Sequence, residues 1–64
     1  MDRPYTVLLV ERAKPVRRLT KRLLRRLGFD VMEVSDAPAA LEVLANDGRH
    51  VDLVLIGAVG LDLR

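Results

Sequence analysis

VDLVLI, residues 51–56, is the most hydrophobic of three short apolar runs that alternate with two helix-like patterns. The other two runs are Val7–Val10 and Val31–Val34. Short, continuous apolar runs are typical of strands that are buried on both faces of a parallel sheet. Strands that alternate with helices predict right-handed crossovers, so the expected fold class is α/β with element order β-α-β-α-β.

Two amphipathic stretches separate the runs. Lys14-Pro15 opens the first helix, because proline is tolerated in a first turn, and Gly28 is a typical residue to end it. Apolar positions at helical spacing are expected to face the sheet: Val16, Leu19, Thr20, Leu23, Leu24 and Leu27. Ser35 or Asp36 is expected to cap the second helix. Its expected buried stripe is Ala37, Ala40, Leu41 and Leu44.

Right-handed crossovers place the first strand in the centre, which predicts a parallel sheet of order 2-1-3 with one helix on each face. The expected strands are Val7–Val10, Phe29–Val34 and Val51–Ile56. Residues 1–64 are expected to form one domain, equivalent to half of a flavodoxin-like fold. The outer edge of the third strand then has no neighbour.

Composition excludes several functional classes. The chain has no cysteine and only one histidine, His50, so a disulfide or a Cys/His metal cluster is not expected. No apolar run approaches the ~20 residues of a membrane span, and no signal-peptide pattern precedes the first strand. We therefore expect a cytoplasmic protein without membrane contact, without a metal and without a cofactor.

Charge is distributed unevenly along the chain. The formal net charge is only +2, but eight of the eleven basic residues lie between Arg12 and Arg26, and no acid occurs between Arg12 and Phe29. Opposite the apolar stripe, the first helix is expected to present a basic interaction face: Arg17, Arg18, Lys21, Arg22, Arg25 and Arg26. The lack of interleaved aromatic residues argues against sequence-specific DNA binding.

Five segments of the chain, collinear and at the usual spacing, resemble the receiver domain of bacterial two-component response regulators. They are Val7-Leu8-Leu9-Val10-Glu11, Val16-Arg17-Arg18-Leu19, Leu27-Gly28-Phe29-Asp30-Val31, Ser35-Asp36-Ala37 with Ala40-Leu41, and Val51-Asp52-Leu53-Val54-Leu55. A receiver accepts a phosphoryl group on an aspartate at the end of its third strand. A Mg²⁺ ion, held by that aspartate and by an acidic pair after the first strand, assists the transfer.

The functional positions depart from that pattern. Gly57 stands where the resemblance places the phosphoacceptor, and the acidic pair is reduced to Glu11 beside Arg12. The resemblance thus implies a degenerate receiver that is not an enzyme and has no catalytic residue. Asp62 lies beyond the strand end without a pre-formed metal site, so it is not expected to replace the acceptor. Glu11 is expected to be a strand-end residue paired to Arg12 or Lys14 rather than a cation ligand.

The open edge of the third strand needs a partner, because unpaired N–H and C=O groups bind other strands. We expect a second copy of the chain to pair with it, antiparallel about a two-fold axis, to give a six-stranded sheet. A domain swap, or a second half supplied by another chain, is the next option. The expected contacts of this dimer edge are Val51, Leu53, Val54, Leu55 and Ile56.

The sequence therefore predicts a non-phosphorylatable, receiver-like protein-interaction module of two-component signal transduction that acts as a homodimer. By the resemblance, a histidine kinase or a phosphotransfer protein is a further partner, docking on the first helix. Nucleic acid is not the favoured partner, but a small basic protein that binds it non-specifically through the first helix stays an alternative. The other alternative is a fragment or model of a half α/β fold that has no function of its own.

Overall fold

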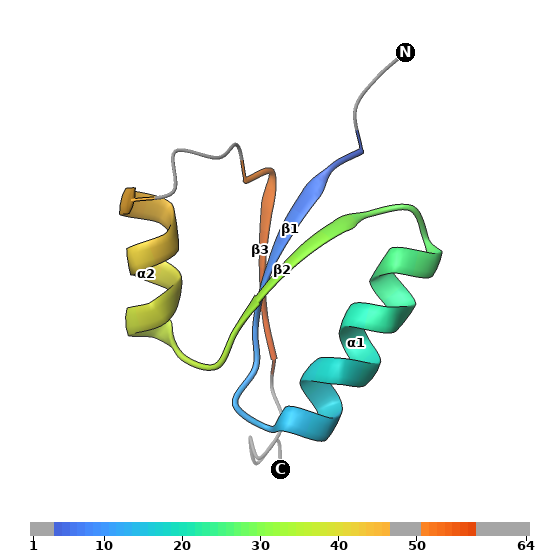
Figure 1. The fold of residues 1–64 in the computed structure, drawn as a ribbon, viewed down its shortest axis with the longest axis horizontal. Helices are drawn as coiled ribbons and strands as arrows, with labels where there is room; N and C mark the ends of the chain where they lie inside the picture. Colours follow the sequence, from blue (N-terminus) through green and yellow to red (C-terminus); the bar gives the residue numbers. More distant parts are fainter. Residues whose placement is uncertain (1–3, 47–50, 58–64) are drawn as a thin grey trace, which may run out of the picture.

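The structure, a computed structural model, describes residues 4–46 and 51–57 and consists of a parallel sheet between two helices (Figure 1). In chain order the elements are β1 (Thr6–Val10), α1 (Lys14–Arg26), β2 (Asp30–Val34), α2 (Ala37–Asn46) and β3 (Leu53–Ile56). The strand order is β2-β1-β3, and α1 and α2 lie on opposite faces of the sheet. The predicted α/β fold, β-α-β-α-β with order 2-1-3, is confirmed.

β1 is the most buried element. All five of its residues are buried, and the side chains of Val7 and Leu8 have no exposed surface. The strand pairs in parallel with β2 along its whole length, and with β3 from Val7 opposite Leu53 to Val10 opposite Ile56. A strand with neighbours on both sides and a helix over each face must be apolar throughout, which explains the continuous run in the sequence.

Because side chains alternate along a strand, the register assigns each of them to one face of the sheet. Leu8 and Val10 lie on the α2 face, where they form a core cluster with Ala40. Partly buried side chains pack against this cluster: Met32, Val34, Val43 and Val51. Val7 and Leu9 lie on the α1 face. Neither helix is centred on β3, because α1 and α2 both contact β1 and β2 within the described residues.

Local interactions explain both ends of α1 and the start of α2. Pro15 lies in the first turn of α1, where its missing N–H costs nothing. At the other end Gly28 has φ +100°, its N–H bonds to the Arg25 carbonyl, and the Phe29 N–H bonds to the Leu24 carbonyl. This is a Schellman motif, which favours glycine at the left-handed position. Asp36 caps α2, because its Oδ1 accepts a hydrogen bond from the Ala39 N–H at 2.9 Å.

Three strand boundaries differ from the predicted ones. β1 begins at Thr6 rather than Val7. β2 begins at Asp30 rather than Phe29, since the Phe29 N–H belongs to the end of α1. β3 begins at Leu53 rather than Val51. Before β3, the Asp52 carboxylate accepts a hydrogen bond from the Thr6 N–H at 2.7 Å, and the Asp52 N–H donates to the Thr6 carbonyl at 2.9 Å. The Asp52 side chain thus binds the Thr6 N–H, which a longer β3 would bind with a backbone carbonyl group.

The predicted buried stripes of the helices are only partly correct. On α1, Leu19, Leu23 and Leu27 are 54%, 49% and 73% exposed, while Val16, Thr20 and Leu24 are half-buried. On α2, Ala40 is buried, but Leu41 and Leu44 are 65% and 47% exposed. The physical reason is the position of the helices, which cover β1 and β2 and leave the apolar flanks beside β3 without cover.

Candidate functional site

β3 is exposed on both faces, although its sequence is that of a buried strand. We define the β3 surface as its four side chains, which are 37–71% exposed: Leu53, Val54, Leu55 and Ile56. In the described part of the chain β3 pairs with β1 alone, so its other edge presents backbone N–H and C=O groups without a neighbouring strand. The predicted dimer-edge residues therefore lie together, apart from half-buried Val51, which packs against the core cluster.

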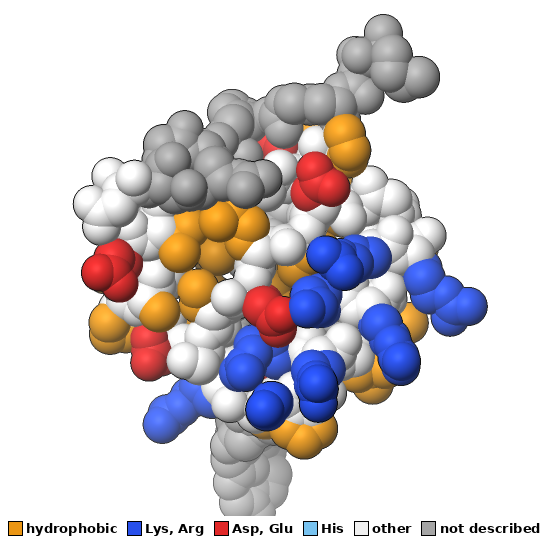
Figure 2. Space-filling model, viewed as in Figure 1, with side chains coloured by type: hydrophobic (Ala, Val, Ile, Leu, Met, Phe, Trp, Pro, Cys, Tyr) orange, Lys and Arg blue, Asp and Glu red, His pale blue; other side chains and the backbone are white. Residues whose placement is uncertain are grey.

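Exposed apolar side chains also lie on both helices, and those of α2 extend the β3 surface. On the α1 face lies the leucine ridge, which consists of Leu19, Leu23 and Leu27 at four-residue spacing. On the α2 face, Val54 and Ile56 line one wall of a groove of about 700 Å³, and Leu41 and Leu44 of α2 line the opposite wall. Figure 2 shows apolar side chains gathered between α2 and the sheet.

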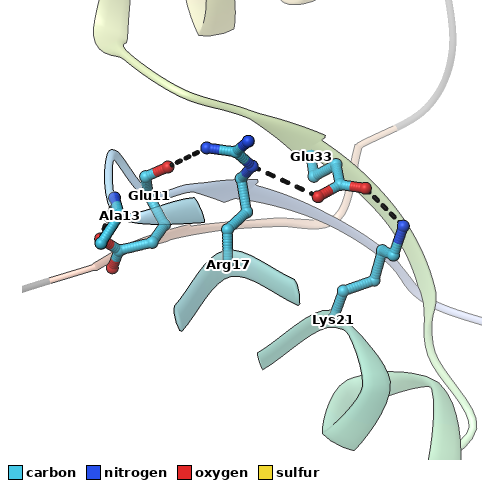
Figure 3. A network of polar contacts seen from close by, with 5 residues as sticks. All are labelled: Glu11, Ala13, Arg17, Lys21 and Glu33. Carbon is cyan, nitrogen blue, oxygen red and sulfur yellow. Dashed lines mark hydrogen bonds and ion pairs between the residues drawn. The ribbon is translucent and has the colours of Figure 1, made fainter. Parts of the chain in front are cut away.

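At the carboxyl ends of β1 and β3, Glu11 lies beside Gly57. Glu11 is only 4% exposed, and its Oε2 accepts a hydrogen bond from the Ala13 N–H at 2.9 Å (Figure 3). A Cβ atom on residue 57 would lie 2.6 Å from the Cδ of Glu11 and still closer to its Oε1. The Glu11 side chain thus fills the space in which a side chain at position 57 would begin.

The surroundings of Glu11 differ from the predicted ones. The Glu11 carboxylate accepts a hydrogen bond from the backbone N–H of Ala13, two residues along the chain. Within the described residues, the predicted ion pair of Glu11 with Arg12 or Lys14 does not form. No group of three or more His, Asp or Glu side chains in residues 4–46 and 51–57 could hold a metal ion. Asp62 and His50 lie outside the described residues.

A polar network joins α1 to the sheet at β2 (Figure 3). Glu33 lies on the α1 face of β2, and its carboxylate binds Arg17 Nε at 3.3 Å and the Lys21 ammonium. The Arg17 Nη1 also donates a hydrogen bond to the Glu11 carbonyl oxygen at 2.9 Å. One guanidinium therefore connects the end of β1, the first turns of α1 and the middle of β2.

The network changes the ionisation of Glu33. The hydrogen bond from Lys21, together with the positive charges of Lys21 and Arg17, holds the pKa of Glu33 below its ordinary value, against an opposing effect of burial. Two members of the predicted basic face, Arg17 and Lys21, are thus not free cations on an open surface. Their side chains are only 17% and 29% exposed, because both reach across to Glu33.

The other four members of the predicted basic face do form an open surface, which we call the arginine face: Arg18, Arg22, Arg25 and Arg26. All four are exposed, and Figure 2 shows the Lys and Arg side chains gathered over α1. Sequence periodicity correctly predicted their side of the helix. It missed Glu33, although an acid between the apolar residues of β2, opposite a basic helix, was the available signal for an ion pair.

Comparison of the chain with models of protein families, with curated proteins and with solved structures found no match in any of the three. The resemblance to receiver domains therefore rests on the collinear segments of the sequence. None of the helices in the described segments is long and apolar enough to span a membrane.

Proposed function

We propose that the chain is a non-phosphorylatable, receiver-like protein-interaction module whose first partner is a second copy of itself, bound through β3. The observation that supports this function most strongly is the β3 surface, an apolar strand exposed on both faces and at one edge. Such an edge invites pairing with another strand, and natural proteins normally cover or charge it. No Lys, Arg, Pro or β-bulge protects the four residues of β3.

A second copy fits the β3 surface because a single two-fold axis brings the strand edges, the leucine ridges and the grooves of the two copies together. Antiparallel pairing of two β3 strands needs a two-fold axis perpendicular to the sheet, which places both copies of α1 on one face and both copies of α2 on the other. The leucine ridges then approach each other, as do the two grooves. Every exposed large apolar side chain of the described residues, other than Tyr5, belongs to these surfaces.

The proposal includes no phosphotransfer step. Position 57 carries no nucleophile, and the space around it is taken by Glu11. The fixed positive charge of Arg12 would oppose a divalent cation at the same place. In this proposal the module acts in the cytoplasm, in a two-component pathway, with a histidine kinase or phosphotransfer protein as a further partner.

A single-cysteine scan of β3 tests the proposed pairing, since the chain has no cysteine of its own. Leu53, Val54, Leu55 and Ile56 are each replaced by Cys, and disulfide-linked dimers are measured after mild oxidation. Across an antiparallel pair, opposite Cα atoms lie about 4.5–5.5 Å apart, within the range that a disulfide spans. We expect fast cross-linking at one or two neighbouring positions, next to the two-fold axis, with slower reaction on either side.

The matched control is Asp30→Cys, which places an exposed cysteine in β2, at the opposite edge of the sheet. We expect this variant to stay monomeric in denaturing, non-reducing electrophoresis. Equal cross-linking of Asp30→Cys, or no cross-linking at any of the four β3 positions, would overturn the proposal.

A further inference from the structure

The arginine face is a second surface that the proposed dimer does not use. Arg18, Arg22 and Arg26 follow one another at four-residue spacing, and Arg25 lies between the last two, so the four guanidinium groups share one side of α1. Leu19 of the leucine ridge lies beside Arg18 and Arg22 at the border of this side. In the described residues, the acid that contacts α1 is Glu33, and Arg17 and Lys21 already bind it.

The chemistry of the arginine face suits phosphate groups. A guanidinium donates paired hydrogen bonds in a planar fork that matches two phosphate oxygens, and it stays charged at any physiological pH. No acidic residue occurs in the first turn of α1 or anywhere else along it. Four cations on a helix of 13 residues, about 20 Å long, therefore form a dense array without internal neutralisation.

We propose that the arginine face binds the phosphodiester backbone of nucleic acid without sequence preference. No aromatic side chain lies on α1 to stack on bases, so phosphate contacts are the means of binding that the face offers. An anionic membrane is the less favoured ligand. A membrane-bound helix inserts apolar side chains beside its cations, and in the proposed dimer the leucine ridge that could do so faces the other copy.

The test is binding of the whole chain to a short mixed-sequence DNA duplex, measured by fluorescence anisotropy across a salt series. Contact with four duplex phosphates gives a slope of about −3.6 in log K against log salt, or a steeper one when both copies in a dimer bind. Arg22→Gln is expected to lower the steepness by about 0.9 per copy that binds. Arg12→Gln is the matched control, because Arg12 lines the groove between α2 and β3 instead.

The expected result is salt-dependent binding that weakens in Arg22→Gln and is unchanged in Arg12→Gln. Three results would overturn the proposal: no binding at low salt, equal loss in both variants, or binding to phosphatidylserine vesicles but not to the duplex. The outcome is independent of the proposed dimer, since one copy of α1 carries the whole face. Loss of DNA binding together with an intact dimer would therefore remove only this inference.

Discussion

Glu33 holds α1 against β2 by its charge, so its contribution to stability depends on pH. In the folded protein the pKa of Glu33 is lowered by Lys21 and Arg17, whereas in the unfolded chain it returns to its ordinary value. The stabilisation is therefore fully present above that value and is lost as the pH falls through the lower pKa of the folded state.

Substitution of Glu33 by Gln should remove this dependence. We expect Glu33→Gln to lower the free energy of unfolding by about 1 kcal/mol at neutral pH, the upper range for a partly exposed ion pair, and to flatten its decline in acid. Urea unfolding at a series of pH values measures both effects. Glu42→Gln, an exposed acid of α2, is the control and should keep the wild-type profile. Identical acid profiles for all three proteins would contradict the role assigned to Glu33.

By the resemblance to receiver domains, phosphotransfer would depend on the residue at position 57, which is Gly57. We expect the intact mass of the wild-type chain to stay unchanged on incubation with Mg²⁺ and a small phosphodonor, because no carboxylate stands at the end of β3. Gly57→Asp should behave in the same way, since the new side chain meets the Glu11 carboxylate and lies near Arg12. Mass spectrometry that detects one added phosphoryl group on the wild-type protein would refute this prediction.

Single residues were predictable from the sequence where their role is local. Pro15 and Gly28 act within one turn of a helix, so their positions in the sequence were enough to predict both ends of α1. For the start of α2 the sequence left Ser35 and Asp36 as alternatives, and Asp36 is the cap. Glu11 and Glu33 could not be assigned in this way. The space that Glu11 fills and the partners of Glu33 depend on how α1, β2 and the end of β3 meet in three dimensions.

At the scale of elements, the leucine ridge of α1 should matter for association more than for the fold of one chain. Truncation of a buried leucine such as Leu8 to Ala typically lowers the free energy of unfolding by about 2–5 kcal/mol. Leu23 is 49% exposed, so Leu23→Ala should destabilise a monomer much less. In the proposed dimer, Leu23 lies near the ridge of the other copy. Leu23→Ala then removes one buried side chain from each copy.

We expect Leu23→Ala to raise the dimer dissociation constant by roughly tenfold or more, a typical effect for an apolar interface residue. Sedimentation velocity over a concentration series measures the constant. Arg22→Ala, one residue away on the arginine face, should leave it unchanged. A dissociation constant that is equal in both variants and in the wild-type protein would exclude the leucine ridge from the interface.

Periodicity predicted the elements themselves better than their burial. The apolar positions of α1 and α2 recur as expected, but half of the predicted stripe on α1 is exposed. A helical pattern shows which side chains share a flank. It does not show where on a sheet the helix lies, and here both helices cover β1 and β2 instead of β3.

For the whole molecule, the topology followed from the chirality of crossovers, which allows little choice once three strands alternate with two helices. The same topology leaves β3 at an edge, although its composition is that of a central strand. Burial of both faces of β1 and exposure of both faces of β3 are the clearest contrast in the structure. We propose that a second copy of the chain resolves this contrast by covering β3.

The most direct test of that claim is the mass of the wild-type chain in solution, measured by sedimentation equilibrium at micromolar concentrations. The proposed pairing of β3 strands predicts twice the mass of one chain, with dissociation on dilution. A mass of one chain throughout this range, in a sample whose circular dichroism shows the folded α/β structure, would contradict it.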